Sequence, residues 1–197
     1  NEITHESWQF FALEIELWRI GSSPAAPRFN VVCRPNDWSR AVRDEAAKVE
    51  AASPTQAFQL KFWTAFRDYM FNKGLKAPKP SPQSWQSFRV GRTGFSIEGV
   101  IKRHERQMLV RLYINCDDLP PKQVFHYLLA RQTTIEQAMA MSLTWQELPE
   151  KKGCVIFASK AEVNFDDEAT WNSQFAWLEA TIASMEKVFR PLIVPLQ

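Results

Sequence analysis

The chain has 197 residues, a formal net charge of +2 and a hydrophobic content of 45%, which together indicate a globular protein with enough apolar side chains for a core. No run of 18 or more apolar residues is present, which excludes a membrane-spanning helix, and the N-terminus carries no basic-then-apolar signal pattern. We therefore expect a cytoplasmic protein without membrane contacts.

Cysteines and histidines are too few and too scattered to indicate a site. There is no CxxC pair, so neither a disulfide framework nor a structural zinc site is expected. The residues concerned are Cys33, Cys116, Cys154, His5, His104 and His126. We expect no metal site, no catalytic residue and no cofactor.

The N-terminal stretch predicts two strands, Trp8–Ile20 and Arg28–Arg34, which the short connection makes an antiparallel hairpin. Two strands alone are marginally stable in water, so the hairpin needs a further surface to pack on. Glu14 and Glu16 share one strand face, but no further metal-binding signature accompanies them, and we interpret them as solvated positions.

Two helices are predicted next, a polar one at Trp38–Ala51 and an aromatic one at Thr55–Asn72. The aromatic side chains of the second helix could form a base-stacking platform, but a single aromatic helix face more commonly packs on a sheet, and we favour core. Leu75–Pro82 contains three prolines and predicts an extended connector.

The segment Trp85–Asn115 predicts a three-stranded β-meander. Apolar and polar residues alternate over Phe95–Lys102 and again over Met108–Ile114, as in half-buried strands. Gly91 and Gly94 mark the first turn, and His104 to Arg106 the second. Gly91–Gly94 lacks the pattern of a phosphate-binding loop, and its glycines fit a hairpin turn, although phosphate contact stays open because Arg89 and Arg92 flank it.

The C-terminal part predicts two helices separated by two strands. We expect Asp117-Asp118 and Asp166 to Glu168 to cap the helices rather than to bind metal, and Pro191 to stop the last helix. The predicted elements are a helix at Pro121–Ala140, strands at Leu143–Leu148 and Cys154–Ala158, and a helix from Asp166 to Arg190.

Strands in consecutive runs with helices between them predict an α+β architecture: an antiparallel sheet with helices packed mainly on one face, preceded by a β-hairpin. We divide the chain into a hairpin that ends an upstream domain (1–37), a helical connector with a Pro/Lys linker (38–80) and a C-terminal α+β domain (81–197). The chain starts at Asn1 without a turn or capping signal, so a fragment of a longer protein is expected.

Positive charge concentrates in the middle of the chain. Residues 73–111 hold nine basic and two acidic residues, a net +7, which leaves −5 for the remainder of a chain of net charge +2. Such segregation favours a surface that contacts the phosphate backbone of a nucleic acid, although a charged sheet edge can also serve only to prevent aggregation. The candidate nucleic-acid-binding residues are Arg89, Arg92, Lys102, Arg103, Arg106 and Arg111.

Dispersed motifs over about Phe58–Pro191 resemble a bacterial domain family of unknown function. The motifs are Phe62-Trp63 with Phe66, Pro80 to Trp85, Gly91-Arg92-Thr93-Gly94-Phe95, Ile135-Glu136, Leu143-Thr144-Trp145, Trp171 with Phe175 and Trp177, and Val188-Phe189-Arg190-Pro191. Met141 departs from the pattern, since a glycine is expected to end the helix there. The opening stretch, including Pro35-Asn36-Asp37-Trp38, is similar to the segment that closes the upstream domain in such proteins.

The resemblance implies the C-terminal, non-catalytic part of a restriction-endonuclease-like protein, with the nuclease-like domain as an intramolecular partner. We therefore expect an accessory module that contacts the nucleic-acid backbone through the basic meander. The alternative is a protein-interaction or dimerisation module, including a homodimer, with no affinity for nucleic acid.

Overall fold

The computed structural model describes residues 12–18, 26–33 and 53–196, which belong to two compact units, 1–53 and 54–197. The helix expected at Trp38–Ala51 lies outside the described residues. The second unit begins at Pro54, so the aromatic helix belongs to it as a structural element and not only as a connector.

The first unit contains a two-stranded antiparallel sheet of β1 (Ala12–Trp18) and β2 (Ala26–Cys33), as the hairpin prediction requires. Ile15 pairs with Phe29 and Leu17 with Pro27 across this hairpin. Ile15 and Leu17 are 60% and 72% exposed, so the apolar side of β1 is largely uncovered at these two positions.

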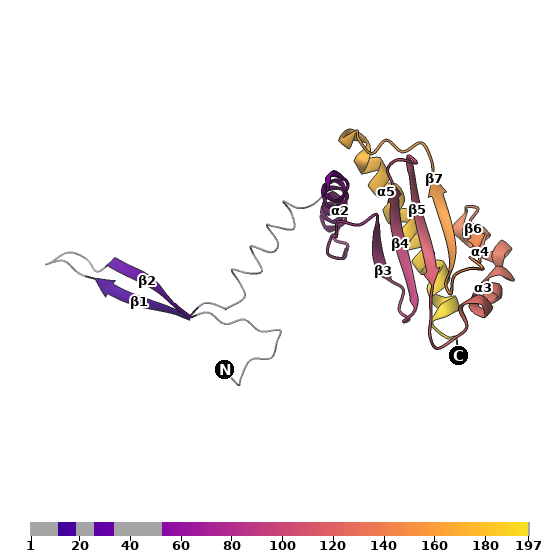
Figure 1. Cartoon of the computed structure of the whole chain (residues 1–197), viewed down its shortest axis with the longest axis horizontal. Coiled ribbons are helices and arrows are strands. Elements are labelled where there is room, and N and C mark those ends of the chain that lie inside the picture. The colour runs from indigo at the N-terminus through magenta and orange to yellow at the C-terminus, as the bar shows by residue number, and fades with distance from the viewer. Residues whose placement is uncertain (1–11, 19–25, 34–52, 197) are drawn as a thin grey trace. The chain divides into compact units, whose positions relative to one another are not determined.

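The second unit is built on a five-stranded antiparallel sheet in the order β3-β4-β5-β7-β6 (Figure 1). The prediction of an α+β fold with an antiparallel sheet is therefore confirmed. The strands are β3 (Trp85–Arg89), β4 (Phe95–Lys102), β5 (Gln107–Ile114), β6 (Thr144–Gln146) and β7 (Cys154–Lys160).

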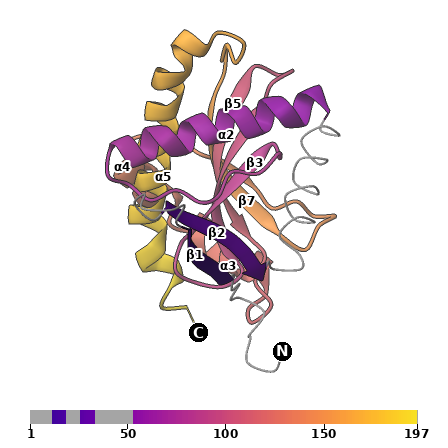
Figure 2. The same ribbon diagram turned by 90° about the vertical axis from the view of Figure 1, so that its left-hand side faces the viewer.

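Four α-helices and one turn of 3-10 helix accompany this sheet in the described part of the chain. They are α2 (Pro54–Asn72), α3 (Pro121–Leu129), α4 (Gln132–Met139), η1 (Glu168–Thr170) and α5 (Trp171–Ile193). Helix α5 runs along the strands, whereas α2 runs across them (Figure 2).

The core forms between the helices and one face of the sheet. Phe62, Trp63 and Phe66 of α2 are 0–1% exposed, and Phe62 packs edge-on against Trp171 and Phe175 of α5 at centroid distances of 5.2 and 5.1 Å. The aromatic stripe of α2 is therefore core, as we favoured, and not a base-stacking platform. Gly99 lets Trp63 approach β4, because a Cβ there would lie 3.3 Å from the indole.

The meander forms with the predicted strands and turns. Ile97 pairs with Leu112 and Phe95 with Ile114, and all four side chains are buried toward the helices. The expectation that the strands are only half-buried is wrong for the opposite face, because Val100 and Leu109 there are each 6% exposed. Neighbouring side chains on the sheet shield these two residues even though they alternate with the core positions.

The single helix predicted at Pro121–Ala140 is two helices, α3 and α4, with a break at Ala130 and Arg131. Buried side chains end at Leu128 and resume only at Ile135, so the turn between them has no fully buried residue to hold it straight. The break lets α4 turn toward α5, where Ser184 Oγ donates to Met139 Sδ.

Two helix ends differ from the sequence-based expectation. The last helix continues through Pro191 to Ile193, because a proline in the final turn removes only one helical hydrogen bond. Helix α4 ends at Met139, and its C-cap Ala140 has a φ of +53°, the left-handed conformation expected of a glycine at position 141. The Met141 N–H donates to Glu136 O.

None of the helices described is both long enough and apolar enough to cross a membrane.

Candidate functional site

The six candidate basic residues do not form one cluster. Arg92 lies in the β3–β4 turn, while Arg103 and Arg106 lie in the β4–β5 turn at the opposite end of β4. The eight residues of β4 separate these turns by about 23 Å. Arg89 and Arg111 lie on the strands between them, on the face that points away from Trp63.

Arg92 is part of the fold. Its guanidinium donates to Asp118 Oδ2 at 2.6 Å and to the carbonyl oxygens of Ile193, at 3.2 Å, and Leu196, and its side chain is only 14% exposed. The hydrogen bond from Arg92 lowers the pKa of Asp118. Arg92 thus satisfies the C-terminal carbonyls of α5, where a cation is also favoured by the helix dipole.

The aspartates predicted to cap the helix after the meander act differently. Pro120 occupies the N-cap of α3, and no side-chain hydrogen bond caps it. Asp117 pairs with Lys152 and Asp118 with Arg92. The cap prediction is therefore wrong at this helix, whereas Asp167 Oδ1 does accept the Ala169 N–H at η1, 3.1 Å away.

The three cations around the β4–β5 turn each have an acidic partner. Lys102 Nζ lies 2.8 Å from Glu105, and Arg106 lies 3.7 Å from Glu162. Arg103 Nε donates to Asp166 at 3.0 Å, and its guanidinium also lies over the ring of Phe58. Asp166 and Glu162 come from the segment before α5, so the fold brings acidic residues from a distant part of the sequence to the basic turn.

Arg111 pairs with Glu98 on the neighbouring strand. The two lie opposite each other in the register, with Arg111 Nε 2.7 Å from Glu98 Oε2, and Ser96 Oγ donates to Glu98 Oε1 at 3.0 Å. Glu98 is 6% exposed. This partly buried, hydrogen-bonded pair holds the middle of the sheet face opposite the helices, so Arg111 is not available as a free cation.

Arg89 alone among the six candidates lacks an acidic partner within the described part of the chain. The other five have five acidic partners, which reduces six positive charges to about one at these sites. Ion pairs with acidic residues from outside the segment reduce its net charge of +7 to about +3; these residues are Asp118, Glu162, Asp166 and Glu179.

Sequence reasoning did not identify the apolar character of the sheet face opposite the helices. We name this surface the open face, and its apolar members are Trp85, Val100, Leu109, Tyr113, Val155 and Phe157. Val100, Leu109 and Val155 are buried, yet they lie outside the hydrophobic cluster formed with the helices. Trp85, at the β3 edge of this face, is 39% exposed.

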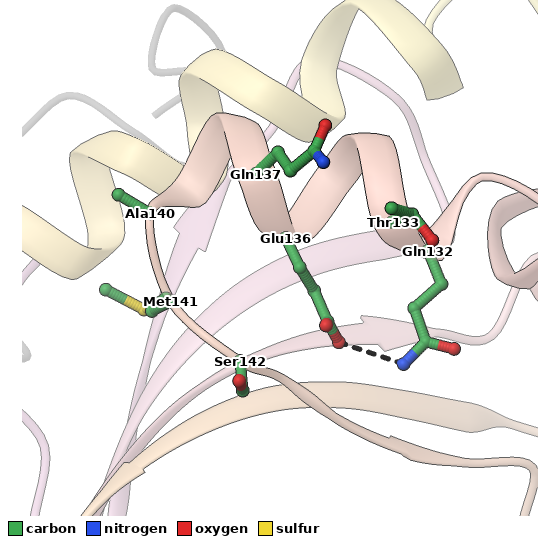
Figure 3. A pocket seen from close by; sticks show the side chains of 7 residues that line it. All are labelled: Gln132, Thr133, Glu136, Gln137, Ala140, Met141 and Ser142. Carbon is green, nitrogen blue, oxygen red and sulfur yellow. Dashed lines mark hydrogen bonds between the residues drawn. The ribbon is translucent and has the colours of Figure 1, made fainter.

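A shallow pocket lies below α4, and Glu136 points toward Gln132 at its side (Figure 3). Glu136 Oε1 accepts hydrogen bonds from the indole of Trp145 at 2.9 Å, from Gln132 at 3.0 Å and from the Leu143 N–H at 3.2 Å. These bonds lower the pKa of Glu136, the Trp145 bond most. The carboxylate thus joins α4 to β6, and the pocket is a by-product of this structural connection.

A second hollow runs beside β3, between the connector after α2 and α5. We name it the β3 groove, and it is lined by Leu75 to Pro78, by Ser87 to Arg89, and by Ile182 and Glu186 of α5. Arg89, the candidate cation without a partner, lies on its wall.

Metal and thiol chemistry find no support among the residues that the structure describes. No three His, Cys, Asp or Glu side chains gather there to hold a metal ion. Cys116 and Cys154 are free and buried, and burial raises the pKa of both thiols above the ordinary value. Both thiols are therefore protonated near neutral pH and poorly reactive.

The fold and its surfaces define an α+β domain with an antiparallel sheet, helices mainly on one face, and on the opposite face apolar side chains around the Glu98–Arg111 pair. The chain belongs to the family described as domain of unknown function (DUF4268), whose model matches residues 58–193. The resemblance to a family of unknown function is thereby confirmed over the range in which it was found.

Two further comparisons give little beyond the family. No curated protein matches the chain. A solved structure titled "Crystal Structure of the ExsC-ExsE Complex" is similar with a TM-score of 0.41 and 9% sequence identity, covering 71% of this chain and 98% of that chain.

Proposed function

We propose that this chain is a non-catalytic accessory module that binds another protein through the open face of its sheet. The observation that carries the proposal is the set of apolar side chains on that face, which lie outside the core cluster and end in the exposed Trp85. Trp85 is the most exposed apolar member of this face, and tryptophan is enriched among residues that contribute most to binding.

The pattern of ion pairs argues against the phosphate backbone as the main ligand. Exposed ion pairs are weak, so a phosphate could displace Glu162 from Arg106. However, attraction of a polyanion depends on the summed charge of a surface, and five acidic partners leave the six candidate cations with about one net charge. A nucleic acid would gain little at these sites.

We further propose that the module acts beside a restriction-endonuclease-like domain, as the family resemblance implies. That domain, in the same protein, is then the first candidate for the protein partner. Binding of nucleic acid by the assembled protein would depend mainly on surfaces outside residues 54–196.

Fluorescence anisotropy with labelled duplex DNA, single-stranded DNA and RNA over a salt series tests the proposal against its rival. We expect no salt-dependent affinity for any of these nucleic acids, and therefore no binding that is lost when Arg103 and Arg106 are replaced. Salt-dependent binding that is lost in an Arg103→Ala, Arg106→Ala double variant would contradict the proposal and restore the nucleic-acid hypothesis. Light scattering on the same samples reports whether a second copy is the protein partner.

A further inference from the structure

The outer edge of β3 has unpaired backbone groups. The Ile101 N–H donates to Ser84 O at 2.8 Å, and Gln86 and Phe88 continue this hydrogen-bonded register with β4. In an antiparallel pair the intervening residues point their N–H and C=O groups away from the partner strand. Ser87 and Arg89 therefore direct both backbone groups outward, and neither has a backbone partner in the described ranges.

The β3 groove lies along this edge and has an apolar floor. Ile97 and Ile182, which are 1% and 6% exposed, line it together with Phe88. All three belong to the helix side of the sheet. An extended chain paired with β3 would therefore place every second side chain on these apolar residues, and the remaining side chains beside Ser87 and Arg89 on the open face.

The acidic residues that line the groove are neutralised by ion pairs within the described part of the chain, whereas its basic residues are not. Glu179 pairs with Lys73 at 2.7 Å, and Glu186 pairs with Arg190 at 3.0 Å. Lys76 and Arg89 also line the groove, and neither has a carboxylate partner among the residues described. Two uncompensated positive charges therefore flank the outer edge of β3: Lys76 in the lining of the groove, and Arg89, whose side chain lies on the open face.

We infer that the β3 groove binds an extended segment of a partner protein in which apolar and acidic residues alternate. The segment pairs with the outer edge of β3 and adds a sixth strand to the sheet. Its apolar side chains lie toward Phe88 and Ile182, and a carboxylate lies beside Arg89. This mode of recognition takes affinity from backbone hydrogen bonds and specificity from alternate side chains. The inference rests on the proposed function, that the module binds a protein, and adds to the open face a second contact site and the chemistry of the partner.

The test uses the full chain and three fluorescein-labelled heptapeptides with blocked ends. The first alternates glutamate with valine, the second alternates lysine with valine, and the third is the glutamate peptide with N-methylated glutamates. Binding is measured by anisotropy for the wild type, for Arg89→Glu and for the control Lys151→Glu, which makes the same charge change at an exposed position in the β6–β7 turn. Circular dichroism confirms that each variant is folded.

The wild type and Lys151→Glu should both bind the glutamate peptide, and the N-methylated peptide should bind at least about tenfold more weakly, because the glutamate N–H groups are the donors that face β3 in an antiparallel pair. Arg89→Glu should weaken binding of the glutamate peptide by about five- to tenfold and should increase the affinity for the lysine peptide. Amide exchange adds a structural readout: bound peptide should protect the Ser87 and Arg89 N–H groups and leave those of Gln86 and Phe88, already paired with β4, unchanged.

Two results would overturn the inference. One is the absence of peptide binding at millimolar concentration, and the other is binding that Arg89→Glu leaves unchanged. Either would exclude the groove and leave the open face as the proposed contact surface, because the proposed function is tested separately by the nucleic-acid titration and by crosslinking at position 85.

Discussion

Replacing Gly94 by alanine should destabilise the second unit far more than the same change at Gly74. Both glycines have a positive φ, +81° at Gly94 and +72° at Gly74. A Cβ at position 74 has no heavy atom within 4 Å, whereas a Cβ at position 94 would lie 2.4 Å from the Cα of Cys116. The pair therefore separates the effect of backbone conformation from that of close packing.

The magnitudes follow from these two causes. An alanine in the left-handed region costs about 1–2 kcal/mol, which is the whole expected effect for Gly74→Ala. At Gly94 the clash with a backbone atom adds about 2–3 kcal/mol, for a total of about 3–5 kcal/mol. The Asn115 N–H also donates to Gly94 O at 2.8 Å, so moving the turn would disturb the end of β5.

Urea unfolding followed by tryptophan fluorescence measures both variants, with the slope m as a check that the same surface unfolds. We expect Gly94→Ala to lose at least about 1.5 kcal/mol more than Gly74→Ala. Equal losses would refute the account of this turn as a packing site. The result bears on function, because the glycines of Gly91–Gly94 would then need another explanation, phosphate contact included.

Three further predictions concern individual side chains. Arg92→Ala should destabilise by about 1.5–3 kcal/mol, because a largely buried charged donor to Asp118, Ile193 O and Leu196 O is lost. Arg106→Ala should change the unfolding free energy by less than about 0.5 kcal/mol, and urea midpoints compare the two variants. Ala140→Gly should stabilise by about 0.5–1 kcal/mol, since glycine relieves the positive φ at this exposed position, and a lower midpoint in thermal unfolding would contradict this. The lowered pKa of Glu136 means that its stabilising effect is present above the unfolded value near 4.5 and is lost as the pH falls through the folded pKa. Glu136→Gln should therefore flatten the fall of Tm between pH 5 and pH 3, and an unchanged slope would show that other carboxylates dominate.

Local patterns were sufficient to predict the meander. The alternation of Phe95 to Lys102 and of Met108 to Ile114, with glycines at the first turn, determines which residues pair, because a slip of one residue would exchange the two faces. The core role of Phe62 and Phe66 was predictable for a similar reason, since their spacing places them on one helix face.

The environment of the candidate site could not be read from the sequence, because it depends on contacts between distant segments. Asp166 lies 63 residues from Arg103, and Asp118 lies 26 residues from Arg92. A charge count within a window contains the cations and misses these partners. The +7 of residues 73–111 was therefore a correct count of a segment and a poor guide to the charge of the surface.

The break between α3 and α4 and the left-handed Ala140 were missed for a different reason. Neither Arg131 nor Ala140 is a helix-breaking residue, so local propensity allows the helix to continue through both positions. Tertiary packing decides that it is interrupted there. The packing of α4 on α5, seen in the Ser184–Met139 hydrogen bond, is a contact between distant segments that local propensity does not contain.

The central claim is that the open face contacts protein and not nucleic acid, and photo-crosslinking in cells tests it most directly. A photoreactive phenylalanine analogue at position 85 samples this face, and the same analogue at the exposed position Asn172 of α5 serves as the control. We predict a larger amount of crosslinked adduct at position 85 than at position 172. Proteases should digest the crosslinked partner, and nucleases should leave it intact. A nuclease-sensitive adduct, or no excess over position 172, would contradict the claim.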